Sequence, residues 1–506
     1  MIFMNEEVLG TVVSTMEGPS PSRVDFVVVN GKAHKGMFVE LEYSEGTMIC
    51  MVDELIKTNR YFERPDSVKA IGDELEKNFP AADWEFLIAK AKPLGVFTEK
   101  LIQRSTFPPS PGTKVFVAEN SNIKRFLKLD DEGLNLGQIQ FHGVAMKLNL
   151  SRLLQKHLAL IAQSGAGKSY CVSVILEELL NRKKEQGQIA VIAFDTHGEY
   201  TCFGEPTTEK KDFSNKTKVI DASKIKISLA NVPKHFLEKL LPSLTPVQKR
   251  ELFRIMNKLK QEMKNGVGPF GIDAVRAETN ELDSKSAFPI NSALDDLEKM
   301  NLFSKVDSPA VLNLLKPGEL LVVDLNGIIN QQKKQLIVAY FSSKLFNARR
   351  MKRAPPFVML VEEAHNFIPE GTASEYALAR PTLQTIAREG RKFCASLILV
   401  SQRPKKLDTT TLANCNTHII LRVTNPYDLD HIKQSSEGLD ANSTNMISSL
   451  RVGEAMIVGE AVSAPTFFKV RERESSPSRH ETTLEDAARN YSLDAEKKDE
   501  EADAFL

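Results

Sequence analysis

The sequence has few cysteines, and none of them is placed for metal binding or redox chemistry. The 506-residue chain contains five cysteines, an odd number, with no Cys-x-x-Cys pair among them. They are scattered along the chain at Cys50, Cys171, Cys202, Cys394 and Cys415. A disulfide framework, a zinc ribbon and a thioredoxin-type site are therefore disfavoured, and we expect reduced thiols in a reducing compartment.

Long apolar runs and a net charge are also missing. No run approaches the roughly 20 apolar residues of a membrane span, and Met1–Glu7 lacks the basic region and apolar stretch of a secretory signal. We therefore expect a cytoplasmic protein without a membrane partner. The 66 basic residues balance the 66 acidic residues. This balance argues against a protein that coats DNA through its overall charge, but it leaves local basic patches open.

Changes of pattern along the chain indicate three parts. Residues 1–147 contain short β-branched runs and a proline-rich link at Pro108–Gly112, which is typical of a small β-barrel domain with a linker. Residues 148–470 alternate strands and helices, which predicts an α/β fold with a parallel sheet, interrupted by a helical insertion at about 230–313. Residues 471–506 are charged and poor in apolar residues, as in a solvated helix or a disordered tail.

The segment Ala162–Ser169 has the form of a phosphate-binding P-loop, with Ala162 where many P-loops have glycine. It follows an apolar run that predicts a buried strand and precedes a helical pattern, so an ordinary glycine turn is the weaker interpretation. Small residues let backbone N–H groups approach a triphosphate, while Lys168 reaches the β/γ-phosphates and the Ser169 hydroxyl ligates Mg²⁺. The predicted nucleotide-binding residues are Ser164, Gly165, Ala166, Gly167, Lys168, Ser169 and Tyr170.

An apolar strand pattern at 357–361 ends in Glu362 and Glu363, which is the Walker B form. The strand would carry both carboxylates to the sheet edge where the P-loop lies. We predict that Glu362 holds Mg²⁺, directly or through water, and that Glu363 acts as general base on the attacking water. The alternative is a helix N-terminus that favours acidic side chains, and it weakens once the upstream P-loop is considered.

Three further polar residues follow strands or end a helix. Asp195 comes directly after a strand and could orient water or couple to Mg²⁺, or it could serve only a turn. Arg391 would stabilise charge on the transferred phosphoryl group, or only complement the negative end of a helix. Gln402 could hydrogen-bond water or the γ-phosphate, or be a plain polar strand end before a proline turn.

Taken together, these motifs resemble the HerA family of the HerA/FtsK group of RecA-like motor ATPases. The resemblance covers most of the chain, because the N-terminal β-domain also fits the barrel of the family. The order and spacing of several motifs carry it: 157–169, 195–200, 362–365, 386–393, 401–405 and 452–459.

The resemblance implies a homo-hexameric ring that uses ATP and Mg²⁺ to translocate double-stranded DNA. It also implies a NurA-type nuclease that docks on the N-terminal barrel (HAS-barrel-like) and joins in DNA end resection during double-strand-break repair. The family roles carry over to Lys168, Ser169, Asp195, Glu362, Glu363, Arg391 and Gln402. Where family members can carry an arginine that acts on the neighbouring subunit's nucleotide, this chain has Lys156, which keeps the charge without the bidentate geometry.

Arg403, Lys405 and Lys406 form a basic turn that could reach the pore and contact DNA phosphates. A solvated loop is the interpretation that we favour for this turn from the sequence alone. Two functions of other classes stay open. One is a secretion or conjugation motor, whose relatives usually bring membrane spans. The other is an ATP switch that scaffolds and activates a partner enzyme, for example in defence.

Overall fold

The computed structural model describes residues 8–15, 18–59, 62, 85–98, 101–371, 377–436, 438–478, 484–486, 488–489 and 491. Its contacts divide the chain into two compact units. Unit 1 comprises Met1–Leu153 and Thr417–Arg471, and unit 2 comprises Leu154–Asn416 and Glu472–Leu506. The predicted domain boundaries stay predictions, since the units divide residues 148–470 in a different way. Most of the predicted charged tail lies outside the described residues.

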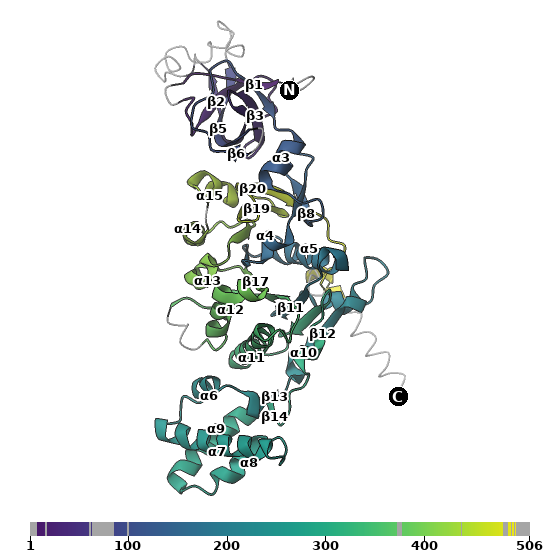
Figure 1. The fold of residues 1–506 in the computed structure, drawn as a ribbon, viewed down its shortest axis with the longest axis vertical. Helices are drawn as coiled ribbons and strands as arrows, with labels where there is room; N and C mark the ends of the chain where they lie inside the picture. The colour runs from purple at the N-terminus through teal and green to yellow at the C-terminus, as the bar shows by residue number, and fades with distance from the viewer. Residues whose placement is uncertain are drawn as a thin grey trace. The chain divides into compact units, whose positions relative to one another are not determined.

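The N-terminal part of unit 1 is a closed antiparallel barrel. Six strands follow one another in the order β2-β1-β7-β3-β4-β5, and β2 also pairs with β5, which closes the ring (Figure 1). The short strand β6 pairs antiparallel with the end of β5. The apolar side chains of these strands form one core that includes Leu9, Phe26 and Cys50. The predicted small barrel is therefore confirmed. Its strands are β1 (Val8–Val12), β2 (Val24–Val28), β3 (Phe38–Tyr43), β4 (Gly46–Asn59), β5 (Glu85–Phe97), β6 (Ile102–Gln103) and β7 (Lys114–Val117).

The rest of unit 1 joins two distant stretches of chain in an antiparallel sheet. Strand β20 pairs with β19 on one side and with β8 on the other, where Phe468 lies opposite Ile139. The strands are β8 (Leu134–Ile139), β9 (Ala145–Leu148), β18 (Thr417–Ile420), β19 (Glu454–Gly459) and β20 (Thr466–Val470). The helices are α3 (Asn120–Leu127), α4 (Leu150–Leu154, at the boundary with unit 2), α14 (Pro426–Ser435) and α15 (Ala441–Ser448).

Unit 2 contains a parallel sheet in the order β12-β15-β11-β16-β17-β10. Every residue of β10, β11, β16 and β17 is buried, which explains their nearly continuous apolar sequences. The predicted α/β core is therefore confirmed. The strands are β10 (Leu158–Ile161), β11 (Ala190–Asp195), β12 (Thr217–Asp221), β15 (Leu320–Asp324), β16 (Phe357–Val361) and β17 (Ala395–Ser401). The associated helices are α5 (Lys168–Asn181), α10 (Val311–Leu314), α11 (Gln331–Arg350), α12 (Arg380–Phe393) and α13 (Thr409–Ala413).

The segment between β13 (Ile227–Ser228) and β14 (Phe303–Ser304) is helical, as the sequence pattern indicates. Its helices are α6 (Lys234–Leu240), α7 (Pro246–Lys264), α8 (Ile272–Thr279) and α9 (Ser284–Lys299), and the last three pack on one another (Figure 1). Thr245 caps α7 in a reciprocal arrangement with Gln248, and Pro246 occupies the first turn. Among the described residues, no helix has both the length and the apolar character needed to cross a bilayer.

One buried histidine in each unit makes the stability of that unit sensitive to acid. In unit 1, His142 Nε2 accepts the Phe38 backbone N–H at 3.0 Å, and in unit 2, His157 Nδ1 accepts the Leu397 N–H at 2.9 Å. Burial lowers the pKa of both imidazoles to about 4. In the unfolded chain each imidazole binds a proton near pH 6.5. The contribution of the two neutral histidines to the free energy of unfolding is therefore complete above pH 6.5 and is lost as pH falls towards 4.

We expect the free energy of unfolding of each unit to fall by about 2 kcal/mol between pH 7 and pH 5 because of its own histidine. Urea unfolding at both pH values, followed separately for each unit, measures this loss. His142→Gln retains an acceptor and should reduce the pH dependence of unit 1 only, while His157→Gln should do so for unit 2 only. Unchanged pH dependence in both variants would show that these imidazoles do not titrate on unfolding.

Candidate functional site

The P-loop connects the carboxyl end of β10 with the first turn of α5. Gly165 and Gly167 have φ values of 75° and 95°, a left-handed conformation that glycine adopts without steric cost. Ala166 between them is fully buried, whereas Ser164 and Gly165 are exposed. The helix begins at Lys168, so its unpaired N–H groups and positive dipole end lie beside the loop, as an anion-binding site requires.

The Lys168 ammonium contacts the two acidic residues that end β16. Its Nζ lies 2.6 Å from Glu363 Oε1 and 3.6 Å from Glu362 Oε1. Although burial works against the charged amine, the two carboxylates raise the pKa of Lys168. The P-loop and the Walker B strand, almost 200 residues apart, therefore meet in one ion cluster. Their sequence patterns predict only that they share one edge of the sheet.

Glu362 is fully buried and held as an anion. Its Oε2 accepts the backbone N–H groups of Thr196 at 2.8 Å and His197 at 3.2 Å. Burial opposes ionisation, but the hydrogen bond from His197 and the charge of Lys168 outweigh it and lower the pKa of Glu362 to about 2. A buried carboxylate that stays charged at neutral pH suits the predicted role in holding a divalent cation.

Glu363 is held in a strained conformation beside Lys168. Its φ and ψ are both 47°, a left-handed conformation that is uncommon for residues other than glycine, and its side chain is 2% exposed. The Oε2 atom has no hydrogen-bond partner and lies 3.3 Å from His365 Nδ1. An uncommon backbone conformation and an unpaired buried oxygen are features found at reactive positions.

Asp195 is also fully buried, and backbone groups occupy both of its carboxylate oxygens. The N–H groups of Gly198, Glu199 and Tyr200 donate to it at 2.8, 3.0 and 2.8 Å. Burial and the Glu362 carboxylate raise the pKa of Asp195 to about 8, against the effect of these donors. These bonds fit the turn interpretation of Asp195, and its predicted role in orienting water stays a prediction.

The loop that Asp195 shapes brings two unpredicted side chains to the site. The side chains of His197, Glu199 and Glu362 place one ligand atom each within 4.8 Å of one another. Glu199 also hydrogen-bonds the hydroxyl of Ser169. Oxygen and imidazole donors of this kind fit a divalent cation. Their place directly after the buried strand β11, in the same turn as Asp195, is a signal in the sequence from which these two residues could have been found.

The other predicted catalytic residues lie at two different edges of the sheet. Gln402 follows β17, whose Ser401 lies opposite Ile161 before the P-loop, so Gln402 is at the nucleotide edge. Lys156 precedes β10, and Arg391 lies exposed near the end of α12, just before β17. Both cations therefore lie at the amino edge, separated from the nucleotide edge by the length of β10 (roughly 13 Å) or of β17 (roughly 23 Å).

The basic turn after β17 opens onto a cavity. Arg403, Lys405 and Lys406 are exposed and line a groove of about 850 Å³ together with residues of α11 and of the segment after Glu363. The turn includes the short 3₁₀ helix Pro404–Lys406. Its three cations thus share one concave surface rather than pointing separately into solvent.

After β20 the chain returns to unit 2 and lies against α5. We call residues 472–478 the return segment. The Ser475 N–H and hydroxyl donate to the fully buried Glu177 at 2.8 and 2.6 Å. The Arg473 N–H donates to the Tyr170 hydroxyl at 2.8 Å, and its guanidinium lies over the Tyr170 ring. Tyr170, a predicted nucleotide-binding residue, thus also anchors this segment.

Comparisons with known proteins agree with this geometry. A family profile described as "Helicase HerA, central domain" matches residues 134–345. A probable helicase of Methanocaldococcus jannaschii is 26% identical over 92% of this chain and 91% of its own length. The "DNA double-strand break repair helicase HerA" of Saccharolobus solfataricus is 26% identical over 91% of this chain and 92% of its own. The VirB4 structure from Thermoanaerobacter pseudethanolicus has a TM-score of 0.53, with 17% identity, and covers 68% of this chain and 97% of its own. That likeness concerns the fold alone.

Proposed function

Because this chain belongs to the HerA family of P-loop ATPases and is an ATP-hydrolysing enzyme, we propose that it is a motor that translocates and unwinds double-stranded DNA in break repair. The observation that carries the ATP-driven part of the proposal is the contact of Lys168 with Glu363, which joins the P-loop to a buried carboxylate pair. The relatives of nearly full-length coverage that are named as repair helicases support DNA as the substrate.

The residues of the site divide the chemistry of hydrolysis among them. The loop N–H groups and Lys168 bind the phosphates, and this draws the ammonium away from Glu363. The freed Glu363 accepts the proton of the attacking water, while Gln402 makes a hydrogen bond to the same water. Ser169 and Glu362 would hold Mg²⁺, with Glu199 and His197 as further donors, and the bound ion would supply the charge that polarises the phosphoryl oxygens.

The positions of two cations at the amino edge of the sheet support an assembly of subunits in a ring. Lys156 and Arg391 lie too far from this chain's own P-loop to contact its nucleotide, so each can act on a triphosphate only when another subunit presents one. A closed ring of identical subunits supplies this arrangement at every interface. We therefore include the homo-hexamer in the proposal, with Arg391 as the charge donor and Lys156 as a second cation.

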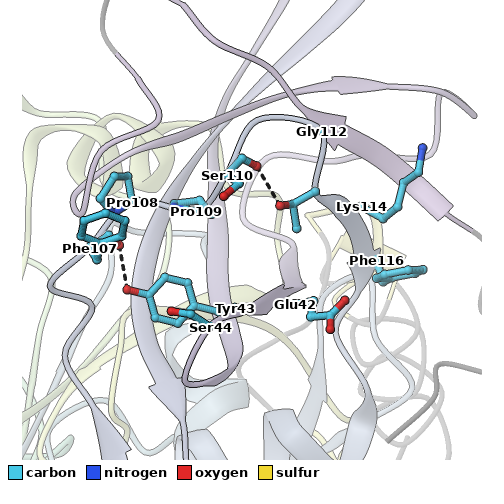
Figure 2. Close-up of a pocket in the computed structure, with 11 residues that line it drawn as sticks. Glu42, Tyr43, Ser44, Phe107, Pro108, Pro109, Ser110, Gly112, Lys114 and Phe116 are labelled. Carbon is cyan, nitrogen blue, oxygen red and sulfur yellow. Dashed lines mark hydrogen bonds between the residues drawn. The ribbon is translucent and has the colours of Figure 1, made fainter.

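A pocket on the barrel supports the docking of a NurA-type nuclease. It has a volume of about 550 Å³ and lies between β7 and the proline-rich link (Figure 2). The Tyr43 hydroxyl donates to the Phe107 carbonyl at 3.0 Å and fixes one wall, while the Phe107 ring remains 66% exposed. An exposed aromatic residue beside a pocket is a typical anchor site for a partner protein.

The test is ATP hydrolysis with and without linear duplex DNA at fixed salt. We expect DNA to raise the rate several-fold, because a motor hydrolyses ATP usefully only when engaged on its track. Closed circular duplex, which has no ends, serves as the comparison that shows whether stimulation requires a DNA end. Hydrolysis that is indifferent to both DNA forms would contradict the motor and favour an ATP switch or a secretion motor.

A further inference from the structure

We propose that the groove beside the basic turn seats a backbone phosphate of the DNA, and that His365 on its wall transmits this event to Glu363. The inference rests on the proposed function and adds to it a physical route from the DNA to the catalytic base. The route begins at the groove, passes through the end of β17 and ends at the unpaired oxygen of Glu363.

The groove has the charge of a phosphate site. Arg403, Lys405 and Lys406 line it from one side, and Gln331 and Gln332 in the first turn of α11 line it from another. The exposed Asn366 adds a further amide to the lining, whereas the amide of the buried Gln335 is already bonded to the Asn366 carbonyl and the Ala379 N–H. This combination of cations, amides and a helix N-terminus favours a phosphate group and reads no base sequence.

One acidic residue also lines the groove, and it is already engaged. Glu370 Oε2 accepts the Thr409 N–H at 2.7 Å and lies 3.4 Å from the Thr409 hydroxyl. These donors hold the carboxylate against the first turn of α13. The cations of the groove are thus in excess, and an anion that enters it meets a net positive lining.

His365 connects the groove with the catalytic base. Its Nδ1 lies 3.0 Å from the Ser401 hydroxyl and 3.3 Å from Glu363 Oε2. The Ser401 hydroxyl in turn accepts the backbone N–H of Arg403 at 3.1 Å. The first residue of the basic turn is therefore linked to Glu363 through only two side chains, Ser401 and His365.

The link has two alternative arrangements. Burial lowers the pKa of His365, which favours the neutral ring. In the tautomer that carries its proton on Nδ1, this single N–H can donate either to Ser401 or to Glu363. In the structure Nδ1 is bonded to Ser401, and Glu363 Oε2 is left without a hydrogen bond. A phosphate that draws Arg403 into the groove shifts the N–H that Ser401 accepts. The Ser401 hydroxyl is then displaced, and His365 is released to orient the carboxylate of Glu363.

The first measurement separates DNA binding from its transmission. Affinity for a duplex is measured over a range of salt for Arg403→Ala and Lys406→Ala, with the exposed Lys184→Ala as the matched control. Each groove variant should weaken binding and reduce the salt slope by about 1, as expected for one lost phosphate contact, while the KM for ATP stays unchanged. Wild-type slopes in both variants would overturn the phosphate site, and a raised KM would assign the groove to nucleotide instead.

The second measurement concerns His365 as a positioning residue. His365→Ala should bind the duplex with wild-type affinity but lose most of the DNA stimulation of kcat. His365→Asn, whose amide can donate from nearly the Nδ1 position, should restore much of the stimulation. Full stimulation in His365→Ala would overturn the route through His365. If DNA does not stimulate the wild-type enzyme, the proposed function itself fails, so the two failures are distinguishable. Circular dichroism confirms that each variant is folded.

Discussion

Glu363→Gln is expected to lower ATP hydrolysis by about 10²–10⁴-fold, the usual contribution of a general base. The amide cannot accept the proton of the attacking water, but it has the same shape and keeps an oxygen within reach of Lys168. Nucleotide binding should therefore remain, and the variant should hold ATP without turning it over. Phosphate release and the binding of a fluorescent ATP analogue measure the two effects separately.

Glu185→Gln is the matched control, since this residue is exposed in the short helix after α5 and makes the same chemical change far from the cluster. It should hydrolyse ATP at the wild-type rate. If Glu363→Gln kept more than a tenth of the activity, the proton would have to leave by another group. The next variant to measure would then be Glu362→Gln.

Lys168→Ala should abolish detectable hydrolysis and also destabilise unit 2. The ammonium contributes phosphate binding, and in the nucleotide-free enzyme it compensates two carboxylates that are at most 2% exposed. Breaking a buried ion pair from one side costs about 3–5 kcal/mol, which corresponds to a fall of roughly 5–10 °C in the thermal midpoint for a unit of this size. Calorimetry without nucleotide measures this fall.

A double variant distinguishes the lost ion pair from a general defect. Lys168→Ala combined with Glu363→Gln removes one uncompensated charge, so part of the lost stability should return although activity stays absent. Simple additivity of the two single variants would mean that Lys168 and Glu363 do not interact in solution. In that case the contact at 2.6 Å would not describe the nucleotide-free enzyme.

Local sequence patterns were sufficient to predict the nucleotide edge of the site. The P-loop lies between a buried strand and a helix, and an acidic pair ends a second buried strand. Both patterns involve neighbouring residues, so a parallel sheet must bring Lys168 and Glu362 to one edge. The start of α7 at Thr245 and Pro246 could be predicted for the same reason, because capping is a local interaction.

Features that depend on distant contacts could not be predicted in this way. The pairing of β20 with β8 joins residues more than 300 positions apart, and the sequence of neither strand indicates which strand it pairs with. The ion pair between Lys168 and Glu363 and the left-handed backbone of Glu363 likewise follow from packing. His197 and Glu199 are harder to predict for another reason: they lie in a turn, where no regular periodicity indicates which side chains face Glu362.

The divided layout of unit 1 has a consequence for synthesis of the protein. The barrel can close as soon as β7 has been made, but β8 acquires its partner β20 only after the complete sequence of the parallel sheet has left the ribosome. Until then one edge of β8 is available to other chains, and closing so long a loop is slow. A recombinant fragment that ends at Leu153 would keep this open edge permanently. To express unit 1 alone, residues 417–471 must be joined back to it.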